Sequence, residues 1–243
     1  MLKKLKEIYN KEQFIPSFLS FFINPYYFIR KGLLKGIKKN RYYMNGIMLD
    51  FGCGSKPYKE LFNVDKYIGL DIERSGHDHK KEQIDFYYDG KTIPFKNEYF
   101  DSVFSSEVFE HVFNFEEILR ELNRVLKKNS YMLVTLPFIW DEHEAPFDFA
   151  RYTTFGIKFL LKKNGFKIIN IEKSTNDIET IFQMWSAYLY QDFFPKSKYL
   201  KFLMTVLFIS LFNLLGMILS FMLPKNNNFY HNSIIVAKKI ADL

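Results

Sequence analysis

The chain has 243 residues, 48% of them hydrophobic, which excludes a disordered protein and allows one sizeable core with an additional element. Cys53 is the only cysteine, so an intramolecular disulfide is excluded and a reducing compartment such as the cytoplasm is expected. The net charge of +7 is uneven, because residues 1–46 hold ten Lys or Arg and two acids, a balance of +8 that leaves the remainder at −1.

Residues 1–23 begin with lysines and continue into an aromatic run over 14–23. Glu7 and Glu12 lie where a signal peptide carries only positive charge, and no small-residue cleavage site follows, so we do not expect export. Two interpretations of the arm remain: a basic, aromatic helical arm on an anionic membrane surface, or helices that cap the domain. Nucleic-acid binding is not expected, since no recognised module accompanies these charges.

From residue 47 onward, apolar strand patterns alternate with helical patterns. This alternation predicts an α/β fold, a Rossmann-like sheet of seven mostly parallel strands with helices on both faces. A helix is predicted over 115–126 with Asn114 as its cap, and another over 155–163 that stops at Asn164-Gly165. The predicted strands are 47–51, 67–71, 84–88, 101–105, 130–136, 166–173 and 232–238.

The first predicted strand ends in a glycine turn that contains Asp50, Gly52 and Gly54. Glycines let the backbone turn sharply and approach a ligand without a Cβ in the way. The second strand ends in Asp71, about 20 residues further on, where nucleotide-binding α/β folds keep a carboxylate for ribose hydroxyls. Together these features predict an adenosine site.

Short motifs in a fixed order over residues 47–174 resemble those of class I S-adenosylmethionine-dependent methyltransferases. The order of the motifs is much more specific than any one of them. One departure is Lys56, which stands where such loops commonly have a third glycine and puts the local geometry of the loop in question. The matching motifs are Leu49 to Gly54, Gly69 to Asp71, Asp89 to Phe95, Phe100-Asp101 and Glu110 to Val112.

The resemblance implies S-adenosylmethionine as the cofactor and a methyl group as the group transferred. It places the glycine turn at the methionine end, Asp71 at the ribose and Asp89 at the adenine amine. Carboxylates suit these positions, because their oxygens accept the protons of the ribose diol and of the amine. The implied cofactor-binding residues are Asp50, Gly52, Gly54, Asp71, Asp89 and Ser106.

The roles of two further groups near the motifs are less specific. Asp101 is interpreted as a structural residue at a strand start. Glu110 and His111 lie on a short predicted helix, where His111 either reaches the site or supports it from behind.

The loop after the fifth strand, residues 137–153, collects titratable and aromatic side chains at the sheet edge where ligands bind in open α/β folds. His143 is the first candidate for the general base and Asp148 the second, while Arg151 is assigned to an anionic substrate group. Alternatively, these residues and Glu144 form an ion network that only fixes the loop. The pattern is similar to a bacterial subgroup linked to cell-surface glycan synthesis.

His77, Asp78 and His79 lie close together in the sequence and suggest a metal site. Neighbouring lysines would repel a cation, and no further group with ligand spacing follows, so no metal is predicted.

Residues 176–225 are unusual because Phe202 to Leu223 holds no charged residue and would extend about 33 Å as a helix. A single crossing would leave the last strand on the wrong side of the membrane. We therefore predict a helical hairpin in one leaflet, and a buried packing or dimer helix is the alternative. The aromatic residues expected near the interface are Trp185, Tyr188, Tyr190 and Tyr199.

The sequence thus predicts a basic arm (1–45), a methyltransferase core (46–175), a hydrophobic insertion (176–225) and a final core strand (226–243). The expected activity is O-methylation of a lipid-linked or glycan-type acceptor at the inner face of the membrane. A soluble methyltransferase of small molecules or quinone precursors and a non-catalytic membrane scaffold are the alternatives. The expected partners are the substrate and an anionic membrane surface.

Overall fold

The computed structural model describes residues 2–73 and 83–242. The chain divides into two compact units: a helical unit of Met1–Lys35 and Lys173–Asn232, and a sheet unit of Gly36–Glu172 and Ser233–Leu243. Helix α3 (Tyr27–Asn40) begins in the helical unit and ends in the sheet unit.

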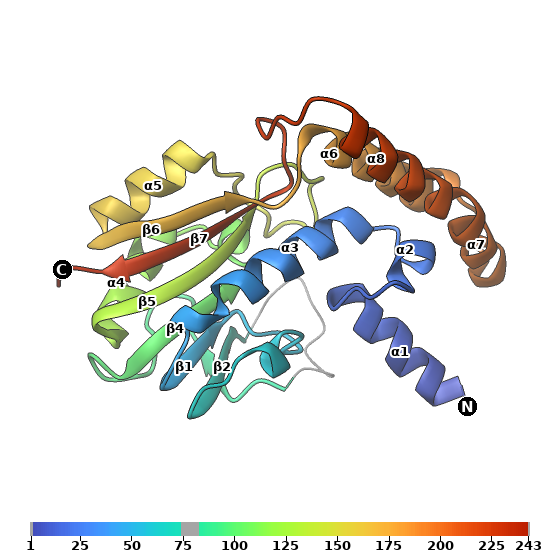
Figure 1. Ribbon diagram of the computed structural model, residues 1–243. Helices are drawn as coiled ribbons and strands as arrows, with labels where there is room; N and C mark the ends of the chain where they lie inside the picture. Colours follow the sequence, from blue (N-terminus) through green and yellow to red (C-terminus); the bar gives the residue numbers. More distant parts are fainter. Residues whose placement is uncertain (1, 74–82, 243) are drawn as a thin grey trace. The chain divides into compact units, whose positions relative to one another are not determined.

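The sheet unit is built on one seven-stranded sheet with the order β3-β2-β1-β4-β5-β7-β6 (Figure 1). The pairs β1–β2, β1–β4, β2–β3 and β4–β5 are parallel, and β7 runs opposite to its neighbours. The predicted seven-stranded, mostly parallel fold is confirmed. The strands are β1 (Ile47–Phe51), β2 (Lys66–Ile72), β3 (Phe86–Tyr88), β4 (Phe100–Ser106), β5 (Leu126–Pro137), β6 (Phe166–Lys173) and β7 (Asn232–Lys239).

The strand order places β1 and β4 side by side at the point where the chain reverses its direction across the sheet. Leu49 and Phe51 of β1 and Val103 of β4 are fully buried, as expected for central strands covered on both faces. In such a sheet, ligands bind beyond the carboxyl ends of the strands at this reversal point. The fold therefore directs attention to the loops after β1, β2, β4 and β5.

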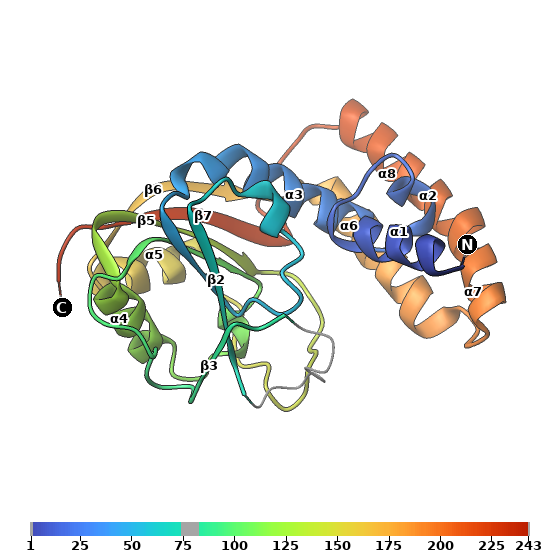
Figure 2. The ribbon, with the colours of Figure 1, turned by 90° about the horizontal axis from the view of Figure 1, so that it is seen from below.

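Helices cover both faces of the sheet (Figure 2). Helix α4 (Phe115–Val125) buries Ile118, Leu119 and Leu122, the face that the 3.6-residue periodicity predicts. Helix α5 (Thr154–Lys163) lies on the same face as α4, and residues 36–40 of α3 lie on the other.

The prediction that Asn114 caps α4 is wrong. Asn114 stands at the N-cap position, but its side chain accepts no hydrogen bond from the helix. Its amide nitrogen instead donates to the Gly90 carbonyl at 3.1 Å and to Glu117 Oε2 at 2.9 Å. The side chain ties the helix start to the loop after β3, a tertiary contact that local sequence does not encode. By contrast, α5 ends as predicted, since Gly165 has a φ of +78°.

The helical unit combines the N-terminal arm with the segment before the last strand. Buried amides connect the two parts: Gln183 donates to the Pro25 carbonyl at 2.8 Å, and Asn213 donates to the Phe21 carbonyl at 2.8 Å. The polar residues of the insertion thus have internal partners. The helices of this unit are α1 (Leu2–Phe14), α2 (Ser20–Ile23), the first part of α3, α6 (Asp177–Tyr188), α7 (Lys198–Met204) and α8 (Ser210–Met222).

Helices α7 and α8 are joined by a π-helical turn (Thr205–Ile209) into one 25-residue helix, Lys198–Met222. This helix is long and apolar enough to cross a membrane, with a mean hydropathy of 2.4, and only 22% of its most apolar window is buried. It packs against α6, and Asn176, the N-cap of α6, donates to Ser220 Oγ at 2.7 Å, while the insertion of this pair into one leaflet stays a prediction. One such helix is by itself weak grounds for membrane insertion.

The conformation at Gly165 gives a test of the fold. An alanine there would place a Cβ 2.6 Å from Asn123 Nδ2 and 2.7 Å from the Ala241 carbonyl oxygen, in a left-handed backbone. We expect Gly165→Ala to lower the free energy of unfolding by more than about 1 kcal/mol in urea denaturation. Gly156→Ala is the matched control, because its Cβ meets only Thr153 Oγ1 at 3.5 Å within a helix, and it should raise stability by about 0.4–1 kcal/mol. Equal stability of the Gly165→Ala variant and wild type would contradict this account.

Candidate functional site

The turn after β1 bends back onto the end of β2. The N–H groups of Gly52 and Cys53 both donate to the Leu70 carbonyl, at 2.9 and 3.2 Å. Gly52 has a φ of +73°, and a Cβ there would lie 2.3 Å from the Val108 side chain. Only glycine fits this position, so partly exposed backbone without a side chain lies at the reversal point of the sheet.

Asp71 connects the two strand ends. Its Oδ2 accepts the Gly54 N–H at 2.8 Å, and its Oδ1 accepts the Ile72 N–H at 2.8 Å. A carboxylate can accept about four hydrogen bonds. Gly54, with a φ of +45°, and Asp71 are thereby fixed in one cluster, as the spacing of the motifs predicts.

Asp50 lies at the end of β1 and is only 3% exposed, with its Oδ2 accepting a short hydrogen bond from the Tyr67 hydroxyl. Burial raises the pKa of the Asp50 carboxyl to about 7, the Tyr67 hydrogen bond opposes that rise, and the nearby Asp71 adds to it. Near neutral pH this carboxyl therefore exists in both protonation states, and a cation bound beside it would favour the ionised one.

Lys56, the departure from the usual glycine, adopts a φ of +53°. Its side chain is 5% exposed and crosses β2 at Gly69, where a Cβ would lie 2.3 Å from Lys56 Cε, to reach Asp85 Oδ2 at 2.7 Å. The loop thus keeps the left-handed backbone of a glycine with a lysine in it. Sequence spacing did not indicate this ion pair, in which Lys56 is buried and Asp85 is exposed.

Asp89 follows β3 and Ser106 ends β4, two strands that β2 and β1 separate in the sheet. Asp89 Oδ1 accepts the N–H groups of Lys91 and Thr92 at 2.8 and 2.7 Å, and these bonds lower the pKa of its carboxyl. Ser106 Oγ lies 2.9 Å from Thr135 Oγ1, which donates to Glu107 Oε1 at 2.6 Å. Asp89 is fully exposed and shapes its own loop, so its contact with a ligand stays a prediction.

The loop after β5 is held by an ion pair. Arg151 donates to both carboxylate oxygens of Asp148, at 2.5 and 2.7 Å, and also to the Asp141 carbonyl at 2.9 Å. Asp148 Oδ2 further accepts the His143 N–H at 3.0 Å and lies 3.2 Å from His143 Nδ1. Of the three residues proposed from the sequence as catalytic, His143 and Arg151 therefore each contact Asp148.

The bidentate Arg151 guanidinium lowers the pKa of the Asp148 carboxyl to about 2, and the same contact raises the pKa of Arg151. Because both Asp148 oxygens are engaged, Asp148 is a poor proton acceptor near neutral pH. Asp148 instead contacts Nδ1 of His143, a position from which a carboxylate can orient the ring.

Glu110 and His111 bring the loop after β4 to this cluster. They lie on a short 3₁₀ helix, Phe109–His111, and the Glu110 carbonyl accepts the Phe149 N–H at 2.8 Å. His111 Nδ1 contacts the Phe147 carbonyl at 2.8 Å, and its ring centroid lies 4.8 Å from that of His143. His111 therefore lies beside the candidate base. Its direct contact with a ligand stays a prediction.

The Glu110 side chain is 1% exposed, and burial, together with the negative charge of Glu107, raises the pKa of its carboxyl well above the ordinary range. Sequence reasoning assigned no role to Glu110. The sequence feature that could have indicated a role is the Glu110-His111 pair directly after a strand end. This pair points to a site only when His143 is known to lie beside it. His77, Asp78 and His79 lie outside the described residues, so the prediction about them is untested.

The comparisons with known proteins agree with this geometry. Residues 49–134 match a family model described as a methyltransferase domain. The matched segment runs from the glycine turn through β5, and the sheet around it has the strand order given above. Residues 49–134 of the chain therefore form a methyltransferase domain.

Solved structures with the fold of this methyltransferase domain include proteins of different function. SpnF, described as a [4+2]-cyclase, has 15% identity and a TM-score of 0.55 over 86% of this chain and 82% of its own. Phosphoethanolamine N-methyltransferase 2 from Haemonchus contortus, in complex with S-adenosylmethionine, has 16% identity and a TM-score of 0.53 over 95% and 59%. An S-adenosylmethionine-dependent methyltransferase from Mesorhizobium loti has 12% identity and a TM-score of 0.51 over 87% and 99%.

Structural similarity at 12–16% sequence identity shows that the fold is shared and does not show a shared function. No significant match is found among curated proteins. The acceptor of the methyltransferase domain therefore has to be argued from its own residues.

The Asp148–Arg151 pair gives a pH-dependent prediction. Since the folded-state pKa of Asp148 lies below its ordinary value, its stabilisation is present above about pH 4 and is lost as the pH falls toward 2. We expect Asp148→Asn to lower the free energy of unfolding by about 2 kcal/mol at pH 7, and the difference from wild type to shrink as denaturation is repeated down to pH 3.

Glu142→Gln is the control, because it removes an exposed carboxylate from the same loop and should change stability by less than about 0.5 kcal/mol at any pH. A difference between Asp148→Asn and wild type that does not vary with pH would show that the ion pair is not the cause.

Proposed function

We propose that the protein transfers a methyl group from S-adenosylmethionine to a hydroxyl of a lipid-linked or glycan-type acceptor, at the inner face of a membrane. The observation that carries the methyl-transfer part is the cluster of the glycine turn and Asp71 at the reversal point of the sheet, together with a histidine of oriented ring in the loop after β5. The membrane part rests on the apolar helix of the helical unit.

The residues at the strand ends fit the cofactor. Val108 leaves no space for a side chain at Gly52, so the cofactor would meet bare backbone there. Asp71 would accept the ribose hydroxyls, and Asp50 would lie nearest the positive sulfur, whose charge favours the ionised carboxylate. When bound, S-adenosylmethionine supplies an electrophilic methyl group. Asp89 and Ser106 complete the proposed cofactor set.

His143 is the proposed base. Its Nδ1 lies 3.2 Å from Asp148 Oδ2 and 3.2 Å from the Asp141 carbonyl oxygen, and both are acceptors. The proton of a neutral ring therefore sits on Nδ1, and the lone pair is on Nε2. His143 Nε2 would take the proton of the acceptor hydroxyl while the methyl carbon exchanges its bond to sulfur for one to the acceptor oxygen, with S-adenosylhomocysteine as the leaving group. The proton transfer would be worth on the order of 10²-fold or more.

Asp148 and Arg151 act through His143 in this proposal. The two terminal nitrogens of Arg151 donate to Asp148 and to two backbone carbonyls, while its buried Nε has no partner among the described residues. This favours a positioning role over the binding of an anionic substrate group. Proper alignment of the acceptor supplies the larger share of the acceleration.

The helical unit supports action at a membrane. It contains twelve Lys or Arg and five Asp or Glu, so it carries the whole net charge of +7, while the sheet unit is neutral. Its long helix presents exposed apolar side chains over most of its length. Basic charge and apolar surface in one unit match an anionic bilayer. These exposed side chains include Phe202, Leu203, Leu207, Phe208, Leu211, Leu214, Leu215, Ile218 and Phe221.

The cofactor site is tested by titrating labelled S-adenosylmethionine. Asp71→Asn removes the charge that accepts the ribose hydroxyls and should weaken binding about 10- to 100-fold. Asp101→Asn is the matched control, since Asp101 stands at the start of β4 and binds Ile47 N and Lys127 instead. Equal binding by wild type and Asp71→Asn would remove the cofactor assignment.

The membrane site is tested by sedimentation with vesicles rich in anionic lipid. Leu207→Asp/Leu211→Asp places two charges on the exposed face of the long helix and should reduce bound protein at least tenfold, because a buried charge is costly in lipid. Phe155→Asp, at an exposed aromatic residue of the sheet unit, should leave binding unchanged.

The acceptor is tested in the same experiment by adding labelled cofactor with lipid and aqueous extracts of the host. Label is expected in the lipid extract, and less of it with the vesicle-binding variant. Label in the aqueous extract alone would favour the soluble methyltransferase, and no product with any extract would favour the scaffold.

A further inference from the structure

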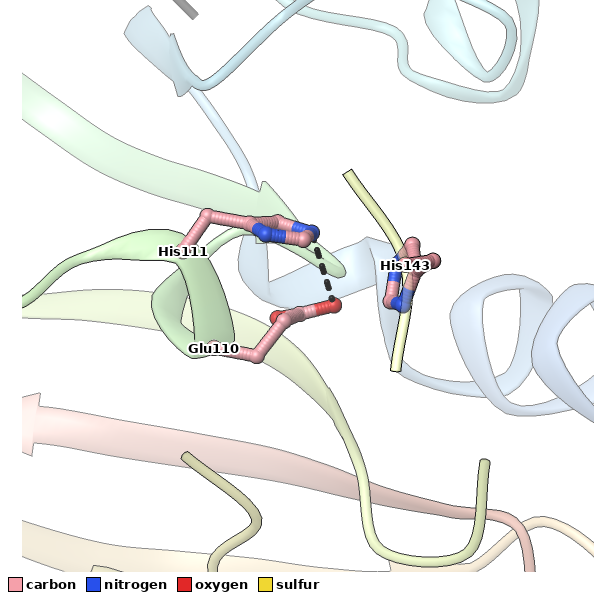
Figure 3. Close-up of side chains that lie close together, drawn as sticks. All are labelled: Glu110, His111 and His143. Carbon is pink, nitrogen blue, oxygen red and sulfur yellow. Dashed lines mark ion pairs between the residues drawn. The ribbon is translucent and has the colours of Figure 1, made fainter. Parts of the chain in front are cut away.

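Three side chains from two loops of the sheet unit converge, and one of them is His143, the proposed base. Glu110 and His111 come from the 3₁₀ helix after β4, and His143 comes from the loop after β5 (Figure 3). One ligand-capable atom from each lies within 4.8 Å of the others. His111 Nε2 is 3.7 Å from Glu110 Oε1 and 3.7 Å from Glu144 Oε1.

The two imidazole rings present their lone pairs in a defined way. His111 Nδ1 lies 2.8 Å from the Phe147 carbonyl oxygen, which can only accept, so Nδ1 carries the proton. His143 Nδ1 likewise faces only the acceptors Asp148 Oδ2 and the Asp141 carbonyl. Both rings therefore leave Nε2 as the basic atom. A histidine whose second nitrogen donates to a carboxylate or a carbonyl is the usual form of a metal ligand.

Glu110 supplies the independent observation. Its side chain is buried, and Oε2 has no hydrogen-bond partner among the residues that the structure describes. The Arg151 guanidinium lies within electrostatic range, but its hydrogen bonds go to Asp148 and to backbone carbonyls. A buried carboxylate oxygen without a partner is costly unless a cation or a proton satisfies it.

We propose that Glu110, His111 and His143 bind one divalent transition-metal ion, with Glu144 as the fourth ligand. Two imidazoles and two carboxylates without a thiolate suit Zn²⁺, and the same set accepts Fe²⁺, Co²⁺ or Mn²⁺. Zinc–ligand bonds of about 2.0–2.1 Å place tetrahedral ligands about 3.3 Å apart. Ligand atoms now 3.7 to 4.8 Å apart therefore close by about 0.4 to 1.5 Å, which rotamer adjustment in the two loops provides.

The metal site changes the role of His143, a consequence that rests on the proposed function. A lone pair bound to a metal ion cannot also take a proton, so base catalysis by His143 and metal binding exclude each other. With the ion in place, the acceptor hydroxyl would be acidified by a Lewis acid at the same position. Metal binding itself depends on the side chains alone and can be measured without any acceptor.

The test uses the full chain, purified without a histidine tag and treated with a chelator. Co²⁺ is titrated while the visible absorption of tetrahedral cobalt is recorded, and Zn²⁺ is titrated by calorimetry. Wild type should bind one equivalent of each and gain thermal stability with Zn²⁺. His143→Asn and His111→Asn should each weaken binding at least 100-fold and abolish the cobalt spectrum.

Two variants complete the test. Glu142→Gln, an exposed carboxylate in the same loop, should bind as wild type does. Glu110→Gln should lose affinity, and His143→Asn keeps the test decisive if that buried variant does not fold, because the His143 side chain is 31% exposed on a loop. Binding that is equal in wild type and His143→Asn, or no binding above the millimolar range, would overturn the proposal.

Methyl transfer with and without the chelator separates the two proposals. Loss of metal binding with retained methyl transfer would remove only the metal site. Tight, His143-dependent metal binding without methyl transfer to any acceptor would remove the proposed function and leave the metal site intact.

Discussion

The Gly52 N–H donates to the Leu70 carbonyl, and the Gly54 N–H donates to Asp71, so two hydrogen bonds tie the turn after β1 to the end of β2. Every other feature of the site depends on this arrangement. It requires positive φ at Gly52 and Gly54, and Val108 excludes a side chain from the first of them. The result is exposed backbone and fixed carboxylates at one edge of the sheet, where a polar ligand can be bound by several groups at once.

The two units of the chain differ in charge and in the kind of side chains that they contain. The sheet unit is neutral and holds the titratable side chains, while the helical unit carries the net charge and the apolar helix. Buried amides such as Gln183 and Asn213 satisfy backbone carbonyls within the helical unit. The apolar face of the long helix can therefore remain outside while the polar residues of the hairpin stay inside. This composition fits an enzyme whose acceptor is held at a lipid surface.

Much of the sheet unit was predictable because its signals are local. Continuous apolar runs indicated the central strands, and the order of motifs from the glycine turn to Glu110 indicated the family. Asn114 was misread, because its side chain donates to the loop after β3 and to the Glu117 side chain and does not cap the backbone N–H groups of α4. The sequence showed that Lys56 departs from the usual glycine but did not indicate how the loop accommodates it. The ion-pair partner of Lys56 is Asp85, which lies in a distant part of the chain. Local patterns do not encode such pairings.

The convergence of Glu110, His111 and His143 was not predictable for the same reason. The residues are about 30 positions apart, and only the parallel pairing of β4 with β5 brings their loops together. The central claim, that carboxylates at the ends of β1 and β2 hold an adenosine, is tested most directly by a crystal structure with S-adenosylhomocysteine. The account predicts ribose hydroxyls on Asp71 and the thioether beside Gly52. A ligand bound elsewhere, with Asp71 untouched, would contradict it.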